Sequence, residues 1–573
     1  MLSQQSKKNI KRKLNFIYKS TKSKKNLKVF SDEIFEVINR YNKFGKKGKK
    51  IKISEKTSVL ISYCDSLLDG NKGKTIKIFR KFYKKRLGNF FDIIHFLPFY
   101  PSSSDSGFAV KDHYQVDKKL GHWSDIYQQS KKTNIMADIV INHASSKGLW
   151  FKNFLINKSP GKEYFLTVDK KFDTSKVIRP RENKLLKKIN IFKKNNFIWR
   201  TFSDDQIDLN FKNPKVLLRF IKIMANLLNH GITIFRLDAI AYLWKKSGSK
   251  CVNLKETHEI IKLLRIICNS FKTQTIIVTE TNLPEKENLS YFGRNNDEAQ
   301  WIYNFSLPPL LVHSFLFEDS TYLNRWSKKL PNTKIGNNYL NFIASHDGIG
   351  MRPVEGYLNK EKLSLLFKRL KKNGGQLSYR KVQGSSKRVY EANITLFNAF
   401  QKTDYDKKGR FILERYISAH AIMIAFEGVP AIYLNSIFGT SNDEYKYIIS
   451  GNKRDLNRYK WNKKKLDNLL NNKSSKQRIF YNQILNLISI KKQIKAFHPN
   501  AKRENFYMGK KIFCFKRTSL EKKQIIYNIT NLSSKYQKLK FNYTFSKYEN
   551  LLDKTSISQK SELKPFETLW LSN

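Results

Sequence analysis

Residues 135–143 read Ile-Met-Ala-Asp-Ile-Val-Ile-Asn-His, an apolar run that carries Asp138 and ends in polar side chains. Three later stretches have the same character: Phe235-Arg-Leu-Asp-Ala239, Val278-Thr-Glu-Thr-Asn282 and Ala344-Ser-His-Asp347. Nearly continuous β-branched and apolar runs are typical of parallel strands that are buried on both faces. Polar residues at the carboxyl ends of such strands are where an α/β barrel keeps its functional groups. The four stretches therefore predict an α/β fold with its chemistry at one end of the strands.

Strand and helix patterns alternate from Ser58 onward. Eight apolar runs read as strands, at residues 59–63, 91–98, 135–140, 232–235, 275–278, 301–305, 339–344 and 429–434. Helical patterns such as those over 214–228 and 258–271 fill the gaps between them. Eight alternations of this kind predict a closed (β/α)8 barrel.

The chain is predicted to comprise three domains. Residues 1–55 are a basic, helical N-terminal extension, residues 56–498 the catalytic barrel, and residues 499–573 a C-terminal antiparallel β domain. Two connections of the barrel, at about 144–209 after the third strand and about 348–393 after the seventh, are far longer than ordinary loops. The first is expected to be an inserted domain, and both are expected to contribute to function.

The charge of the chain is strongly positive. Its 109 Lys and Arg residues against 47 Asp and Glu give a formal net charge of +62. One interpretation is a non-enzymatic basic protein that binds nucleic acid. The other is a generally Lys-rich composition, because Lys outnumbers Arg several-fold and is spread along the chain, whereas phosphate and base recognition favours Arg. We favour the second interpretation and expect no nucleic-acid partner.

The cysteines and the N-terminus indicate the compartment. Four cysteines lie far apart without the CxxC spacing of zinc clusters, and the N-terminus lacks the apolar core of a secretion signal. No stretch approaches the length of a transmembrane helix. We expect a soluble, cytoplasmic protein that is not held to a membrane; the sequence leaves its oligomeric state open.

Two acidic residues suit glycosyl transfer with retention of configuration. That chemistry needs an ionised carboxylate as nucleophile and a protonated carboxyl as acid/base, roughly 5 Å apart. Asp238 and Glu280 follow neighbouring strands and are expected to meet this requirement. Arg236 points to the same side as Asp238 and is expected to lower its pKa, whereas the apolar surroundings of Glu280 are expected to raise its pKa. Further contacts to a sugar are expected from Asp347, His346 and His143.

The four acidic stretches resemble the four signature regions of the alpha-amylase superfamily. Further segments, at 95–117, 344–350, 428–433 and 453–458, look like its sucrose phosphorylase subfamily, and the resemblance covers Ser58 to Trp461. It implies that Asp238 is the nucleophile, Glu280 the acid/base and Asp347 the stabiliser of the transition state. It also implies that Asp105 and Arg454 bind the far hydroxyl of a single glucose. The subfamily usually lacks the calcium site of the superfamily, so we expect no metal although Asn142 is present.

The resemblance implies phosphorolysis of a small α-glucoside to α-D-glucose 1-phosphate, with inorganic phosphate as co-substrate and no other cofactor. The long loop after the seventh strand offers cations for phosphate, among them Arg380, with Tyr390 nearby. Segments 241–258 and 280–293 look most like the glucosylglycerate phosphorylase branch, with sucrose as the rival substrate. An α-glucosidase or transglucosylase of the same fold is the enzymatic alternative.

Overall fold

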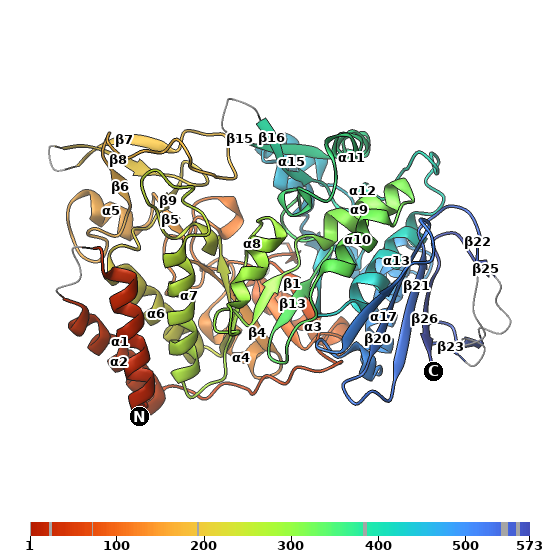
Figure 1. Cartoon of the computed structure of the whole chain (residues 1–573), viewed down its shortest axis with the longest axis horizontal. Helices are drawn as coiled ribbons and strands as arrows, with labels where there is room; N and C mark the ends of the chain where they lie inside the picture. The colour runs from red at the N-terminus through yellow and green to blue at the C-terminus, as the bar shows by residue number, and fades with distance from the viewer. Residues whose placement is uncertain are drawn as a thin grey trace.

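The computed structural model describes residues 2–21, 26–70, 73–191, 194–381, 387–539, 548–556 and 562–573. Eight parallel strands close into a barrel in the order β1-β17-β13-β12-β11-β10-β4-β3 (Figure 1). The predicted (β/α)8 barrel is therefore confirmed, and each of the eight predicted runs supplies one strand. Their bounds are β1 Val59–Ser62, β3 Ile93–Phe96, β4 Asn134–Val140, β10 Ile232–Asp238, β11 Ile276–Thr279, β12 Trp301–Tyr303, β13 Asn338–Asn341 and β17 Val429–Tyr433.

Helices surround the barrel and join its strands. One of them, α6, shows how the sequence sets a boundary: the side chain of Asn213 accepts a hydrogen bond from the backbone N–H of Lys215, and Pro214 occupies the first turn, where its missing N–H costs nothing. Among the described residues, no helix is both long enough and apolar enough to cross a bilayer. The helices around the barrel include α3 Thr75–Arg86, α4 Trp123–Ser130, α6 Pro214–Asn229, α7 Lys255–Ser270, α9 Leu307–Phe317, α10 Thr321–Lys329, α13 Ile412–Ala425 and α17 Lys476–Lys491.

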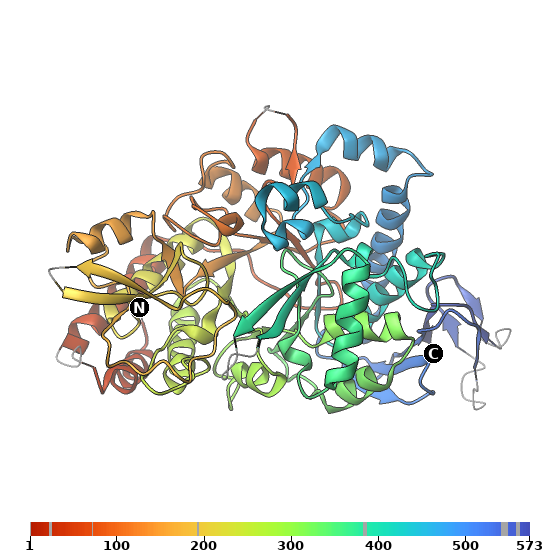
Figure 2. The ribbon, with the colours of Figure 1, turned by 90° about the horizontal axis from the view of Figure 1, so that it is seen from above.

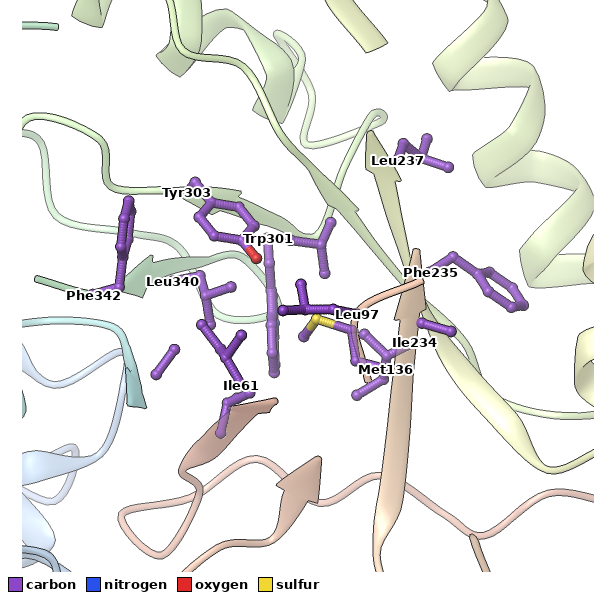
Figure 3. Close-up of a cluster of buried hydrophobic side chains, with 14 of the residues drawn as sticks. Ile61, Leu97, Met136, Ile234, Phe235, Leu237, Trp301, Tyr303, Leu340 and Phe342 are labelled. Atoms are coloured by element: carbon purple, nitrogen blue, oxygen red, sulfur yellow. The ribbon is translucent and has the colours of Figure 1, made fainter. Parts of the chain in front are cut away.

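The barrel interior is filled by side chains. Figure 3 shows Met136, Ile234, Trp301 and Leu340 between the strands, and each of them is at most 1% exposed. All residues of β10 are buried, which explains why its sequence is apolar on both faces. Because the interior is packed, only the carboxyl ends of the strands are open to a substrate.

Two insertions lie above the carboxyl ends of the strands, along the upper edge of the molecule in Figure 1 and towards the viewer in Figure 2. The first, after β4, contains two small antiparallel sheets; the second, after β13, contains a three-stranded sheet and helix α11. Long connections at this face are where barrel enzymes build their sites. The elements are β5 His143–Ser145, β6 Thr167–Val168, β7 Leu186–Ile191, β8 Lys194–Trp199 and β9 Gln206–Asp208, then β14 Ile349–Gly350, α11 Lys360–Lys372, β15 Gln376–Lys381 and β16 Lys387–Asn393.

The C-terminal part of the chain forms a six-stranded antiparallel sheet beside the barrel (Figure 1). Its attachment is polar as well as apolar: the buried Arg517 donates hydrogen bonds to the carbonyls of Ala425 and His498 at 2.6 and 2.7 Å. This guanidinium caps the end of α13 and fixes the sheet against the barrel. The strands are β19 Lys502–Phe506, β20 Ile512–Thr518, β21 Ile525–Asn531, β23 Glu549–Asn550, β24 Thr555–Ser556 and β26 Thr568–Ser572.

The N-terminal extension contains two helices, α1 (Gln4–Tyr18) and α2 (Leu27–Phe44), which lie against α7 and α6. Lys13 forms an ion pair with Glu259 of α7 at 2.5 Å. The ring of Tyr18, at the end of α1, lies 6.3 Å from the ring of Trp244, in the loop that follows β10. Although the segment is basic, its apolar face is therefore part of the folded core.

We predict that Ile10→Ala lowers the free energy of unfolding by about 2–5 kcal/mol, because the side chain is fully buried between α1 and its neighbours and its loss leaves a cavity. Urea unfolding of the full chain measures the change. Arg12→Ala, at an exposed position of the same helix, is the control and should change stability by less than about 0.5 kcal/mol. Equal stability of wild type and Ile10→Ala would mean that the extension does not contribute to the core.

Candidate active site

A pocket opens at the carboxyl ends of the barrel strands. Strand ends, the inserted sheets and the loop after β17 all contribute to its wall. The expected residues Asp105, His143, Asp238, Glu280, Asp347, Tyr390 and Arg454 are brought together there. The remaining lining residues are Phe108, Arg181, Phe202, Gln206, Ala239, Tyr242, Thr281 and Asn282.

Arg236 lies below the pocket floor and contacts two carboxylates. Its Nη1 donates to Asp238 Oδ1 at 2.8 Å and also contacts Asp138. Residues 236 and 238 are two apart on β10, so their side chains leave the strand on the same side. Asp138 is held in turn by His95, whose Nε2 lies 2.8 Å from Asp138 Oδ2. The candidate nucleophile is thus fixed by a buried chain of charged groups.

Glu280 is placed beside Asp238 by the backbone. Its Oε2 accepts a hydrogen bond from the N–H of Ala239 at 2.9 Å. Ala239 has a φ of +51°, a left-handed conformation that costs a non-glycine residue energy and recurs at functional sites. The turn after β10 therefore presents Asp238 to the pocket and an N–H to the neighbouring carboxyl.

The protonation of this pair follows from burial. Burial raises the pKa of Glu280, as expected. The lowered pKa expected for Asp238 was wrong: burial and the nearby Glu280 raise it and outweigh Arg236. Two buried carboxyls that interact in this way titrate as a pair and keep one proton between them above the usual range. Within the pair, the hydrogen bond from Arg236 favours the charged form of Asp238, and the N–H of Ala239 favours that of Glu280.

Asp347 and Asp105 are held by two arginines from the loop after β17. Arg454 Nη1 lies 2.7 Å from Asp347 Oδ1 and 3.9 Å from Asp105 Oδ2. Arg458 Nη1 lies 3.2 Å from Asp105 Oδ1. Burial acts to raise the pKa of Asp347, but Arg454 lowers it well below the usual range. Asp347 is therefore ionised and fixed at one end of the pocket.

The two histidines have different positions. His143 lines the pocket, and its Nε2 lies 3.1 Å from the carbonyl of Phe108. His346 is not in the pocket wall; its ring stacks on Phe108 at 5.1 Å, behind Asp347. Burial lowers the pKa of His143 to about 4 and that of His346 to about 3, so both rings are neutral at physiological pH. His346 acts on the pocket through Asp347 and Phe108.

The two remaining expected residues come from the insertion after β13, and only one of them reaches the pocket. Tyr390, on β16, lines the pocket, whereas Arg380, on β15, is paired with Glu355 at 2.7 Å outside the wall. Sequence reasoning did not single out Arg181, a pocket residue from the first insertion, or Glu391, which binds Arg454 through two hydrogen bonds of 2.9 and 3.0 Å. Glu391 directly follows Tyr390, which the sequence did single out, so the signal for it lay one residue away. No motif marks Arg181.

The residues around Asn142 do not fit a divalent cation. The ammonium group of Lys245 lies 3.1 Å from Asn142 Oδ1 and 2.5 Å from Asp208 Oδ2. The second oxygen of Asp208 accepts from the backbone N–H of Thr201 at 2.7 Å. These oxygens already surround a buried positive charge, and a calcium ion would need them as its own ligands.

Comparisons with known proteins place the chain in a family. Residues 69–356 match the model for the alpha-amylase catalytic domain. The chain is 35% identical over 519 residues to the glucosylglycerate phosphorylase of Escherichia coli (strain K12), covering 90% of this chain and 92% of that protein. The chain belongs to the alpha-amylase family.

Further relatives share the fold or part of the sequence. The chain is 27% identical over 429 residues to the sucrose phosphorylase of Agrobacterium vitis, covering 71% of this chain and 83% of that protein. The solved structure of sucrose 6F-phosphate phosphorylase from Thermoanaerobacter thermosaccharolyticum superposes with a TM-score of 0.71 at 22% identity, covering 84% of this chain and 95% of that one. At this identity the structural likeness concerns the fold alone.

We predict that Lys245→Met lowers the free energy of unfolding by about 3–5 kcal/mol, because it leaves the buried carboxylate of Asp208 without its cation. Thermal unfolding of the full chain measures the loss. Lys246→Met removes the charge of the adjacent, exposed lysine and should leave the melting temperature nearly unchanged. A rise in the melting temperature of the wild type on adding Ca²⁺ would contradict our description of this cluster.

Proposed function

We propose that the chain is a retaining α-glucoside phosphorylase that acts on glucosylglycerate. The observation that carries the proposal is the pair Asp238 and Glu280, one held by Arg236 and the other by the N–H of Ala239 at the mouth of the barrel. The similarity to glucosylglycerate phosphorylases over most of the chain supports the substrate and the use of phosphate.

The mechanism has two displacements at the anomeric carbon. In the first, the carboxylate of Asp238 attacks this carbon, the bond to the acceptor oxygen breaks, and Glu280 gives its proton to that oxygen. In the second, a phosphate oxygen attacks the same carbon, Glu280 takes the proton from phosphate, and the bond to Asp238 breaks. Two inversions give α-D-glucose 1-phosphate with net retention of configuration.

The pocket limits the donor to one glucosyl unit. Asp105, Arg454 and Asp347 form one end of the pocket and are joined by ion pairs. These charged groups can bind the hydroxyls of a single sugar and leave no path for a longer chain beyond it. Asp347, held ionised, is suited to bind hydroxyls more strongly as the ring flattens and becomes positive in the transition state.

Phosphate must enter a site that already contains carboxylates. Two unit charges about 4 Å apart repel each other by about 4 kcal/mol at an effective dielectric constant of 20. Arg181 can compensate this cost, because it lines the pocket and has no ion pair with a carboxylate among the described residues. Its guanidinium lies 5.8 Å from the ring centroid of Tyr390, which also lines the pocket.

We predict that cleavage of glucosylglycerate depends on inorganic phosphate and yields glucose 1-phosphate in equal amounts with glycerate. Parallel incubations with glucosylglycerate, sucrose and glucosylglycerol, each with and without phosphate, measure glucose 1-phosphate and free glucose. The α-glucosidase or transglucosylase alternative predicts turnover without phosphate. Release of free glucose at the same rate in both conditions would overturn our proposal.

We predict that Asp238→Asn lowers kcat for phosphorolysis by about 10⁴-fold or more, because the neutral amide cannot form the bond to the anomeric carbon. Asp169→Asn, the same change at an exposed position of the first insertion, should leave kcat unchanged. Mass spectrometry of the wild type after rapid quenching should find one glucosyl group on the peptide that contains Asp238. Near-normal turnover by Asp238→Asn would exclude this residue as the nucleophile.

A further inference from the structure

Arg352 is a buried arginine that has no counter-ion among the described residues. It begins the short 3-10 helix Arg352–Val354 after β14 and is 4% exposed. Its Nε and Nη1 atoms have no hydrogen-bond partner, and no carboxylate of the described residues lies within ion-pair distance. Other buried arginines have partners: Arg415 pairs with Asp406 at 2.9 Å, and Arg517 donates to backbone carbonyls. Because an unpaired buried charge is costly, a partner from outside the chain is indicated.

The backbone on either side of Arg352 is fixed to the wall of the pocket. The N–H of Met351 donates to the carbonyl of Tyr390 at 2.9 Å. Gly350 lies so close to Asn282 that a side chain at this position would meet the Asn282 amide nitrogen at 2.7 Å. Tyr390 and Asn282 both line the pocket. The segment that carries Arg352 therefore packs directly against this wall.

Two more buried polar atoms on this wall lack partners in the part of the chain that the structure describes. They are the hydroxyl of Tyr242 and the Oδ1 of Asn282, and both residues line the pocket. Burial raises the pKa of Tyr242, while the nearby charges of Arg352 and Arg181 act to lower it and Glu280 acts to raise it. Arg352 therefore acts on the same part of the pocket as Glu280, the group that protonates the acceptor oxygen.

We propose that Arg352 binds the carboxylate of the acceptor and selects an anionic acceptor over a neutral one. This inference rests on the proposed function. A guanidinium presents parallel N–H groups that match the two oxygens of a carboxylate. A neutral acceptor would leave the buried charge of Arg352 unpaired. The free-energy cost of that unpaired charge acts against binding of the neutral acceptor. Glycerate carries a carboxylate where glycerol carries a hydroxymethyl group, so these two acceptors isolate the interaction.

The test uses the reverse reaction, in which glucose 1-phosphate is the donor and glycerate or glycerol the acceptor. Release of phosphate is measured for each acceptor after subtracting the rate with water alone. We expect Arg352→Met to lower kcat/KM for glycerate by about 100-fold while kcat/KM for glycerol changes by less than about 3-fold. Arg352→Lys keeps the charge without the fork and should give an intermediate loss for glycerate.

The control is Arg325→Met. Arg325 is an exposed residue of α10 that donates a hydrogen bond at 2.6 Å to the carbonyl of Tyr357, in the loop that carries Arg352. This substitution should leave the ratio of the two acceptors unchanged. An equal loss for both acceptors in Arg352→Met would overturn the proposal and indicate a structural role or a role towards phosphate. If Arg352→Met does not fold, Arg352→Lys decides, and an unchanged acceptor ratio in it overturns the proposal. Failure of the wild type with both acceptors would instead contradict the proposed function.

Discussion

The contact of Arg236 with two buried carboxylates is the interaction on which the rest of the site depends. Asp138 and Asp238 lie on adjacent strands, and without a shared cation their charges would oppose the closure of the barrel at this point. A guanidinium meets this requirement because it can bind both groups at once and stays charged when it is buried. The neutral His95 satisfies the second oxygen of Asp138, so that Asp238 is the carboxylate left facing the pocket.

Arg454 has the corresponding role on the opposite side of the pocket. It joins Asp347 from the end of β13, Glu391 from β16 and, at longer range, Asp105 from the loop after β3. One side chain therefore ties the second insertion to the barrel. This explains how an excursion of more than forty residues can take part in a site that requires fixed geometry, since its last strand is held by a buried, bidentate ion pair.

The strands and the positions of the two candidate catalytic carboxyls could be predicted because their signal is local. A buried parallel strand is apolar along its whole length, and the polar residue that follows it marks the functional end, as in Asp238 and Glu280. The pKa of Asp238 could not be predicted from Arg236 alone, because desolvation depends on everything packed around the group. Arg181 and Arg352 were missed for another reason: they lie on connections whose course is set by distant contacts. Only the three-dimensional structure reveals that Arg352 is buried and that no described carboxylate pairs with it.

The arginines around the pocket fall into two groups, those with an acidic partner and those without one. At the closed end, the arginines are paired with acidic residues, so this part can accept a neutral sugar without a net change of charge. Elsewhere, Arg181 in the pocket wall and Arg352 in a segment packed against that wall lack such partners among the described residues. A phosphorylase exchanges one group for another at this position, and for glucosylglycerate both the departing glycerate and the arriving phosphate are anions. Arginines without an acidic partner suit either anion in turn, whereas a hydrolase, whose second substrate is water, would gain nothing from keeping them in this state.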